Sequence, residues 1–293
     1  MSEDSVEKYG LNPAETMILE DYREKMPIYE RLRDFVCDLL KKKVAENNIY
    51  VTAVEARIKA EASLAEKLER KNGKYKSLTD LTDILGARVI AFYNDDVDKI
   101  AALVESLFEI DWKNSVDKRK MHELDSFGYN SLHFICTIPK ALFEDPECPE
   151  LNEIKFEIQM RTALQHVWAT LDHDTGYKSG FEIPHEYLRN LNRLAGMLEL
   201  VDEQFCKIRT EINNYRFHVQ SLVHSGRFDE VALNGDSFTN YLKLRPFDKL
   251  NQRIAAINQA EIHESSMMPF LKALKFLRFE TLADVDKLIK ETT

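Results

Sequence analysis

The chain has 293 residues, 44% of them hydrophobic and 31% charged, and this length supports a buried core in one large or two small domains. Its formal net charge of -10 argues against broad, nonspecific binding to nucleic acid, because such binding rests on basic surface. It contains no run of roughly 18 apolar residues and no signal-peptide pattern, so we expect a cytoplasmic protein without a membrane partner.

The first 49 residues are predicted to form a helical lead-in. Residues 14–47 are rich in helix formers with apolar side chains at helical spacing, and Asn12-Pro13 is a helix start signal. Residues 50–58 then carry β-branched side chains in near alternation, which predicts a strand. Residues 60–71 read as a helix that stops at Asn72-Gly73.

Strands and helices alternate over residues 50–180, which we expect to form the central domain. The predicted elements are strands at 85–93, 131–138 and 154–160, and helices at 97–108 and 162–177. This pattern is typical of a sheet covered by helices, with the active groups at strand ends.

Strand signals end after Pro184. Residues 181–225 are predicted to form a long helical extension, whose apolar stripe contains Leu188, Leu191, Leu194, Leu198 and Val201. Residues 226–293, with amphipathic stretches at 270–277 and 282–289, read as a small helical accessory module. We expect a homo-oligomer, if the chain forms one, to assemble through these helical extensions.

A basic cluster lies between Arg57 and Lys76, against the negative charge of the whole chain. Seven lysines and arginines here stand beside three glutamates. Arg57 and Lys59 fall at the strand end, while Ser63, Lys67 and Arg70 share one face of the following helix. Such a face suits a triphosphate, although a run of charge is also typical of a solvated helix surface.

Two carboxylates accompany this cluster. Asp83 precedes Gly86 and Arg88 at the start of a strand, and an acidic group beside a triphosphate is tolerated as a Mg²⁺ ligand. The alternative is that Asp83 caps a turn. On a later strand, alternation places Glu157 and Gln159 on one face, where Glu157 would complete a metal site or act as a base.

An aromatic and a histidine follow a glycine turn at 128–133. Tyr129 is a candidate for stacking on a base, and His133, two pleats further along, lies on the same face. A Tyr and a His at this spacing also occur as packing residues.

Four motifs in this order resemble the synthetase domain of the RelA/SpoT family of alarmone synthetases, from Arg57 to Lys178. They read R-x-K-x-x-x-S-x-x-x-K, D-x-x-G-x-R, G-Y-x-S-x-H and E-x-Q-x-R-T with a trailing H-x-x-x-Y-K. The resemblance implies an α+β fold, with a mixed sheet of about five strands flanked by helices. Because few residues precede Arg57, we expect no hydrolase domain.

The resemblance also implies a role for each matching residue. Arg57 and Arg88 would sandwich adenine, Lys59, Ser63, Lys67 and Arg70 would grip the ATP phosphates, Asp83 and Glu157 would serve Mg²⁺, Tyr129 would stack on guanine, and His133, with Gln159, would contact the acceptor.

The implied reaction is transfer of pyrophosphate from ATP to the 3′-hydroxyl of GTP or GDP. The loop before Tyr129 departs from the family pattern, so the acceptor stays open; Arg119 and Lys120 would supply charge for its phosphates, or are solvated loop charges. The alternatives are a toxin-like relative that modifies tRNA 3′ ends or adenine nucleotides, and an inactive nucleotide-binding module. Intact Asp83 and Glu157 argue against an inactive module.

Overall fold

The computed structural model describes residues 9–117, 131–143, 148–172, 185–259, 261 and 268–292. The chain divides into two compact units, Met1–Cys206 and Lys207–Thr293. The four-part division predicted from the sequence is finer than this and stays a prediction.

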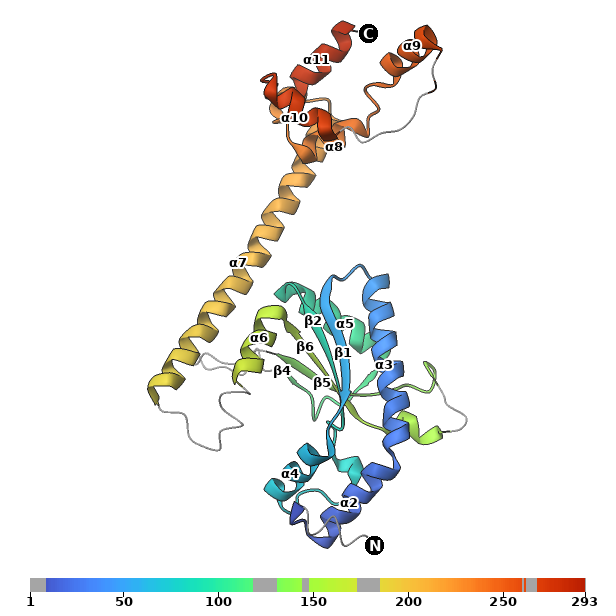
Figure 1. Cartoon of the computed structure of the whole chain (residues 1–293), viewed down its shortest axis with the longest axis vertical. Helices are drawn as coiled ribbons and strands as arrows, with labels where there is room; N and C mark the ends of the chain where they lie inside the picture. Colours follow the sequence, from blue (N-terminus) through green and yellow to red (C-terminus); the bar gives the residue numbers. More distant parts are fainter. Residues whose placement is uncertain are drawn as a thin grey trace. The chain divides into compact units, whose positions relative to one another are not determined.

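The helical lead-in consists of two helices, α2 (Pro13–Glu24) and α3 (Met26–Glu46) (Figure 1). The Asn12 side chain accepts a hydrogen bond from the backbone N–H of Glu15, and the Glu15 carboxylate accepts one from the N–H of Asn12. This capping box satisfies two backbone donors at the start of α2. Pro27, in the first turn of α3, has no N–H to donate, which explains why one helix ends and another begins here.

A mixed sheet forms the centre of the first unit, which confirms the predicted α+β class. Its strands are β1 (Val51–Ile58), β2 (Leu85–Ala91), β3 (Glu109–Ile110), β4 (Val116–Asp117), β5 (Leu132–Thr137) and β6 (Phe156–Thr162). The order is β1-β2-β6-β5-β3, with β4 also paired to β5. The β2–β6 pair is parallel and the other pairs are antiparallel. The strands β3 and β4 have two residues each, too short for an alternation pattern to predict them.

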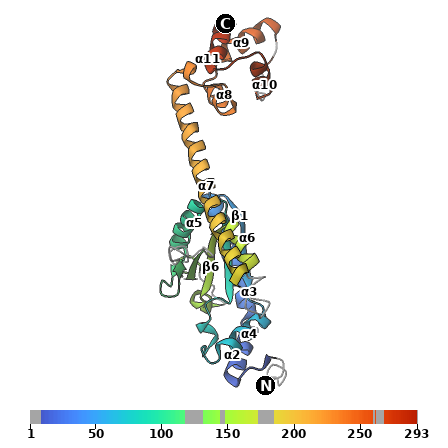
Figure 2. The same ribbon diagram turned by 90° about the vertical axis from the view of Figure 1, so that its left-hand side faces the viewer.

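The sheet has one buried apolar face. In β6, Phe156, Ile158 and Met160 are buried, whereas the alternating Glu157 and Gln159 are partly exposed. The helices α3 and α5 (Asn94–Leu107) contact both the sheet and each other, and their apolar residues share its core. In the turned view, α5 lies beside the strands (Figure 2). The polar face of the sheet is thereby left for the site.

The helix α4 (Glu61–Lys71) carries the basic cluster and follows β1 directly. Leu64, Ala65 and Leu68 are buried, so the residues between them point outward. The helix ends where Asn72 and Gly73 adopt positive φ angles of 23° and 74°, as the Asn-Gly signal predicted. The helix α6 (Ala163–Asp172) runs on from β6, also as predicted, and residues 173–184 lie outside the described part.

The second unit begins within α7 (His185–His224), the predicted long helix. Its other helices are α8 (Gly235–Leu242), α9 (Asp248–Asn258), α10 (Met268–Phe276) and α11 (Leu282–Thr292). Phe238 and Tyr241 of α8 are fully buried in its core, beside residues of α7 and α11. The stretches 270–277 and 282–289 are confirmed as parts of α10 and α11, whereas α8 and α9 were not predicted. None of the described helices has the length and apolar character needed to cross a membrane.

Candidate functional site

A pocket of about 500 Å³ opens at the junction of β1, α4, β2 and β6. This volume falls within the range of small-molecule sites. Its charged lining consists of Arg57, Lys59, Lys67, Arg70 and Arg88 together with Glu66, Asp83 and Glu157. Five cations against three carboxylates leave a local surplus of two positive charges in a chain whose net charge is -10. The pocket therefore favours an anionic ligand.

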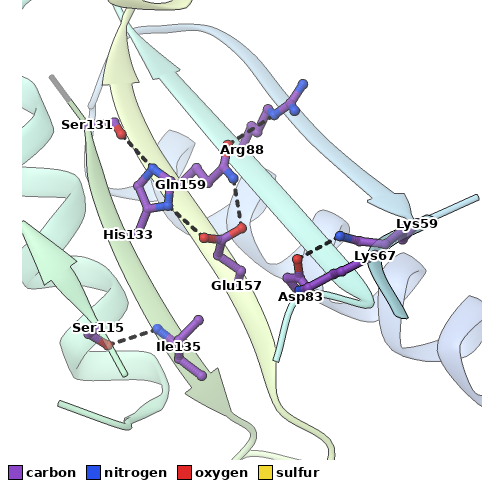
Figure 3. Close-up of polar contacts among 10 residues, drawn as sticks. All are labelled: Lys59, Lys67, Asp83, Arg88, Ser115, Ser131, His133, Ile135, Glu157 and Gln159. Atoms are coloured by element: carbon purple, nitrogen blue, oxygen red, sulfur yellow. Dashed lines mark hydrogen bonds and ion pairs between the residues drawn. The ribbon is translucent and has the colours of Figure 1, made fainter. Parts of the chain in front are cut away.

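Asp83 is held between two lysines (Figure 3). Lys59 Nζ lies 2.7 Å from one carboxylate oxygen of Asp83, and Lys67 Nζ lies 2.7 Å from the other. Burial raises the pKa of Asp83, but the hydrogen bonds from the two lysines outweigh burial, and the net effect lowers this pKa below its ordinary value. Asp83 is therefore a carboxylate at neutral pH, and it holds two cations at the pocket wall.

Local structure explains how these groups meet. Lys59 follows the last residue of β1, and its backbone N–H donates to the carbonyl of Ile84 at 2.8 Å. Asp83 comes two residues before β2, the antiparallel neighbour of β1. Lys67 is on α4, as are Ser63 and Arg70, and all three line the pocket. The predicted helix face is thus the one that points into the site.

A chain of hydrogen bonds crosses the polar face of the sheet from β5 to β2 (Figure 3). Ser131 Oγ lies 2.5 Å from His133 Nε2, and His133 Nδ1 lies 2.6 Å from Glu157 Oε1. Gln159 Nε2 donates to Glu157 Oε2 at 2.8 Å, and its Oε1 accepts from Arg88 Nε at 3.3 Å. Strand register creates this chain, because His133 and Arg88 are both paired with Gln159.

Glu157 lies at the centre of this chain and is mostly buried, with 17% of its side chain exposed. Burial raises its pKa, but the hydrogen bond and charge of His133 and the hydrogen bond from Gln159 outweigh burial, so the pKa falls below its ordinary value. The nearby Asp83 acts in the opposite direction. A carboxylate with a lowered pKa is a weak base near neutral pH.

Arg57 and Arg88 face the same part of the pocket from neighbouring strands. Burial and the positive charge of Arg88 lower the pKa of Arg57. Two guanidinium groups near each other repel, and both stack well on aromatic rings. An anion between them would offset this repulsion, and a nucleobase there would stack on the guanidinium groups.

The residues predicted to serve Mg²⁺ are Asp83 and Glu157, and both line the pocket. In the described part of the chain, no three His, Cys, Asp or Glu side chains form a metal-binding group. This donor set still fits Mg²⁺, because magnesium is usually held by one or two carboxylates, with the remaining positions filled by water and substrate phosphates. The cation itself stays a proposal.

The structure brings most of the predicted site residues together. Arg57, Lys59, Ser63, Lys67, Arg70, Asp83, Arg88, Glu157 and Gln159 all line one pocket, and His133 is bonded to its wall through Glu157. Arg119, Lys120 and Tyr129 lie outside the described residues. Sequence reasoning missed Ser131, which holds His133, and Glu66, the third carboxylate. The Ser131 signal was present, since a residue two before His133 on a strand shares its face.

Comparisons with known proteins identify the family of the domain that carries this pocket. Residues 56–182 match the model of the region found in RelA/SpoT proteins. GTP pyrophosphokinase YjbM of Bacillus subtilis (strain 168) is 29% identical over 160 residues, which are 54% of this chain and 72% of the relative. GTP pyrophosphokinase YwaC of the same strain is 26% identical over 211 residues, 67% of this chain and 94% of the relative.

Solved structures show the same fold. The crystal structure of small alarmone synthetase 1 from Bacillus subtilis matches with a TM-score of 0.56 at 23% identity, over 67% of this chain and 99% of that one. Structures of that synthetase bound to its product pppGpp and to AMPCPP match with TM-scores of 0.54 and 0.51. At 23% identity these matches establish the fold of the sheet unit.

Proposed function

The chain carries a RelA/SpoT domain, and from this premise we propose that it is a GTP or GDP pyrophosphokinase that makes (p)ppGpp from ATP in the cytoplasm. One observation carries the proposal: the pocket gathers, from four separate elements, the cations and the two carboxylates that the motifs predicted. The distant relatives YjbM and YwaC are GTP pyrophosphokinases, which supports the same reaction class.

The donor nucleotide would lie along β1 and α4. Arg57 and Arg88 would hold the adenine, and the cations of α4 would bind the phosphates. Lys59 and Lys67, which form ion pairs with Asp83, would turn to phosphate oxygens as ATP enters. Asp83 and Glu157 would then hold Mg²⁺, which neutralises charge on the β- and γ-phosphate oxygens.

In the transfer, the oxygen of the acceptor's 3′-hydroxyl would form a bond to the β-phosphorus of ATP, and the hydroxyl proton would pass to water. The bond between the β-phosphorus and the bridging α–β oxygen breaks, and its electron pair leaves with AMP. Positioning and charge neutralisation supply most of the rate in such reactions. The lowered pKa of Glu157 favours a role as a Mg²⁺ ligand over a role as the base that deprotonates the acceptor. His133 orients Glu157 and would lie towards the acceptor.

The test is a transfer assay with ATP labelled at the β- or γ-phosphate. The purified chain is incubated with Mg²⁺ and, separately, with GTP, GDP, GMP, ATP or deacylated tRNA, and products are separated by anion exchange. We expect label on a guanine nucleotide, with one AMP formed per transfer. Label on tRNA or on an adenine acceptor would contradict the proposed acceptor. ATP binding without any transfer would show a binding module instead.

A further inference from the structure

The lead-in helix α2 lies alongside α4, the helix that carries the basic cluster (Figure 1). Arg23, in the last turn of α2, donates two hydrogen bonds to the carboxylate of Glu61, the first residue of α4, at 2.9 Å from Nε and 2.6 Å from Nη2. Gly73, beyond the last turn of α4, donates its backbone N–H to Glu15 Oε1, in the first turn of α2, at 3.2 Å. The two helices are thus antiparallel, and α2 bonds to both ends of α4.

A third contact fixes the residue between β1 and α4. Tyr22 Oη, on α2, donates to the backbone carbonyl of Lys59 at 2.5 Å, and the N–H of Lys59 donates to the carbonyl of Ile84 at 2.8 Å. Tyr22 is 1% exposed, and burial raises its pKa, so the hydroxyl keeps its proton and remains a donor. Both backbone groups of Lys59 are therefore held, and this backbone sets the point from which the Lys59 side chain reaches Asp83.

The packing of α4 also depends on α2. Leu64 and Leu68, on the buried side of α4, share one core with Ile18 and Leu19 of α2. Among the described helices and strands, α2 makes the most extensive contact with α4. An isolated helix of 11 residues is marginal in water, so tertiary packing decides whether it forms and how it is turned. The face of α4 that lines the pocket is therefore oriented by the contacts that α2 makes with the rest of the helix.

We propose that α2 positions the cations that bind the phosphates of the donor nucleotide, with Tyr22 acting through Lys59 and Arg23 acting through α4. No residue of α2 lines the pocket, so both are positioning residues. A charge-assisted hydrogen bond needs about 2.7 to 2.9 Å between nitrogen and oxygen, and a shift of roughly 1 Å breaks it. The proposal rests on the proposed function only in taking a polyphosphate as the ligand of Lys59 and Lys67.

The experiment measures the dissociation constants of ATP and of inorganic tripolyphosphate by calorimetry, with Mg²⁺ and without an acceptor. Tyr22→Phe keeps the buried ring and removes the hydroxyl, which leaves the Lys59 carbonyl without this donor. We expect both dissociation constants to rise roughly tenfold, because a lost hydrogen bond and a displaced cation each weaken the phosphate contacts. The matched control Tyr29→Phe removes the hydroxyl of another buried tyrosine, on α3, and should keep the parent constants.

A charge exchange tests Arg23 separately. Arg23→Glu should raise both dissociation constants by about threefold or more, because it places two carboxylates together at the start of α4. The double variant Arg23→Glu, Glu61→Arg should restore most of the affinity, because it forms the same ion pair in reverse. The pair is partly exposed, with 38% and 31% of the two side chains accessible, so we expect both variants to fold.

A Tyr22→Phe constant within about twofold of the parent value overturns the proposal, as does an equal rise in Tyr29→Phe. If Tyr22→Phe melts below the assay temperature, the charge exchange decides, and a double variant as weak as Arg23→Glu alone contradicts positioning through the ion pair. A parent chain that binds ATP but transfers no pyrophosphate would contradict the proposed function, while the binding constants would still decide the role of α2.

Discussion

Asp83 and Glu157 line the same pocket, yet the partners that hold them differ. Asp83 has a lysine ammonium on each oxygen, whereas Glu157 has an imidazole on one oxygen and an amide on the other. Both pKa values are lowered in spite of burial. Asp83 therefore holds two lysine ammonium groups at the pocket, where an incoming phosphate can bind them in its place. Glu157 instead belongs to a hydrogen-bond chain that sets the geometry of the sheet face.

A third carboxylate shows what burial does without such partners. Asp202 is 3% exposed, and its one hydrogen bond in the described part of the chain comes from the hydroxyl of Thr162. Burial raises its pKa above the ordinary value, and the Thr162 bond only partly opposes this. The direction of the pKa shift at these three carboxylates is thus decided by the presence of cationic or amide donors, and not by the depth of burial.

The largest expected effect is on transfer itself. Asp83→Asn and Glu157→Gln should each lower kcat/KM by roughly 10³-fold or more, because both remove a carboxylate that a metal-bound polyphosphate requires. The transfer assay measures this, with Glu153→Gln, an exposed residue outside the pocket, as the control. Normal turnover by either variant in Mg²⁺ would remove that residue from the proposed machinery.

The next effect separates the two lysines of α4, Lys67 and Lys71. Lys67→Ala should lower kcat/KM by roughly 10²-fold, because Lys67 faces the pocket and its loss leaves the phosphates short of one charge-assisted contact. Lys71→Ala removes the same charge from an exposed position of the same helix that does not line the pocket. Equal losses in the two variants would mean that general charge, and not placement, drives binding.

Gly86, which lines the pocket, tests the space beside Glu157. It lies on β2 opposite Glu157, and a Cβ added there would meet no protein atom within 4 Å. Gly86→Ala should therefore keep or slightly raise the melting temperature, since alanine restricts the unfolded chain more than glycine does. The KM for ATP should rise by about tenfold if the nucleotide fills this space. A fall in melting temperature with unchanged KM would point to a purely structural glycine.

Acid unfolding should separate Asp83 from an ordinary surface carboxylate. Because its folded pKa is lowered, Asp83 contributes stability above the ordinary Asp pKa of about 3.9, and this contribution is lost as the pH falls through the folded pKa. Asp83→Asn should cost about 1 to 2 kcal/mol at pH 7. Urea unfolding at several pH values should show this difference shrinking below pH 4. A difference that stays constant with pH would contradict the ion-pair account.

The smallest expected effect is at Asp202, where loss of the charge should stabilise the fold, whereas at Asp83 it should destabilise it. The pKa of Asp202 is raised in the folded chain. Ionisation of this carboxyl therefore lowers the stability of the fold once the pH rises above the ordinary Asp pKa. Asp202→Asn removes the charge and keeps an oxygen that accepts from Thr162, so the melting temperature at pH 7 should rise by a few degrees. At pH 3 the wild type and the variant should differ little. A lower melting temperature at pH 7 would show that the charge has a partner that stabilises it.

The sequence by itself determined the residue classes and their local faces. Helical spacing placed Ser63, Lys67 and Arg70 together, and strand alternation placed Glu157 with Gln159, because the periods of 3.6 and 2 are properties of the backbone. The four motifs also predicted the RelA/SpoT domain, which the match over residues 56–182 confirms. The helices α8 and α9 were not predicted, although the capping box at Asn234 is a local start signal for α8. Phe238 and Tyr241 of α8 are buried in the core of the second unit, whereas α9 buries none of its residues.

Only the tertiary structure decided which of these faces meet. The register of β5, β6 and β2 puts His133 and Arg88 beside Gln159 and joins Ser131 to the site, and no local period specifies a register between strands far apart in the chain. The two ion pairs of Asp83 likewise form only in the folded chain, because Lys59 follows β1, Lys67 is on α4 and Asp83 precedes β2. Charges and hydrogen-bond donors can be read from a sequence, but the pKa they produce depends on distance and burial, which only the folded chain sets.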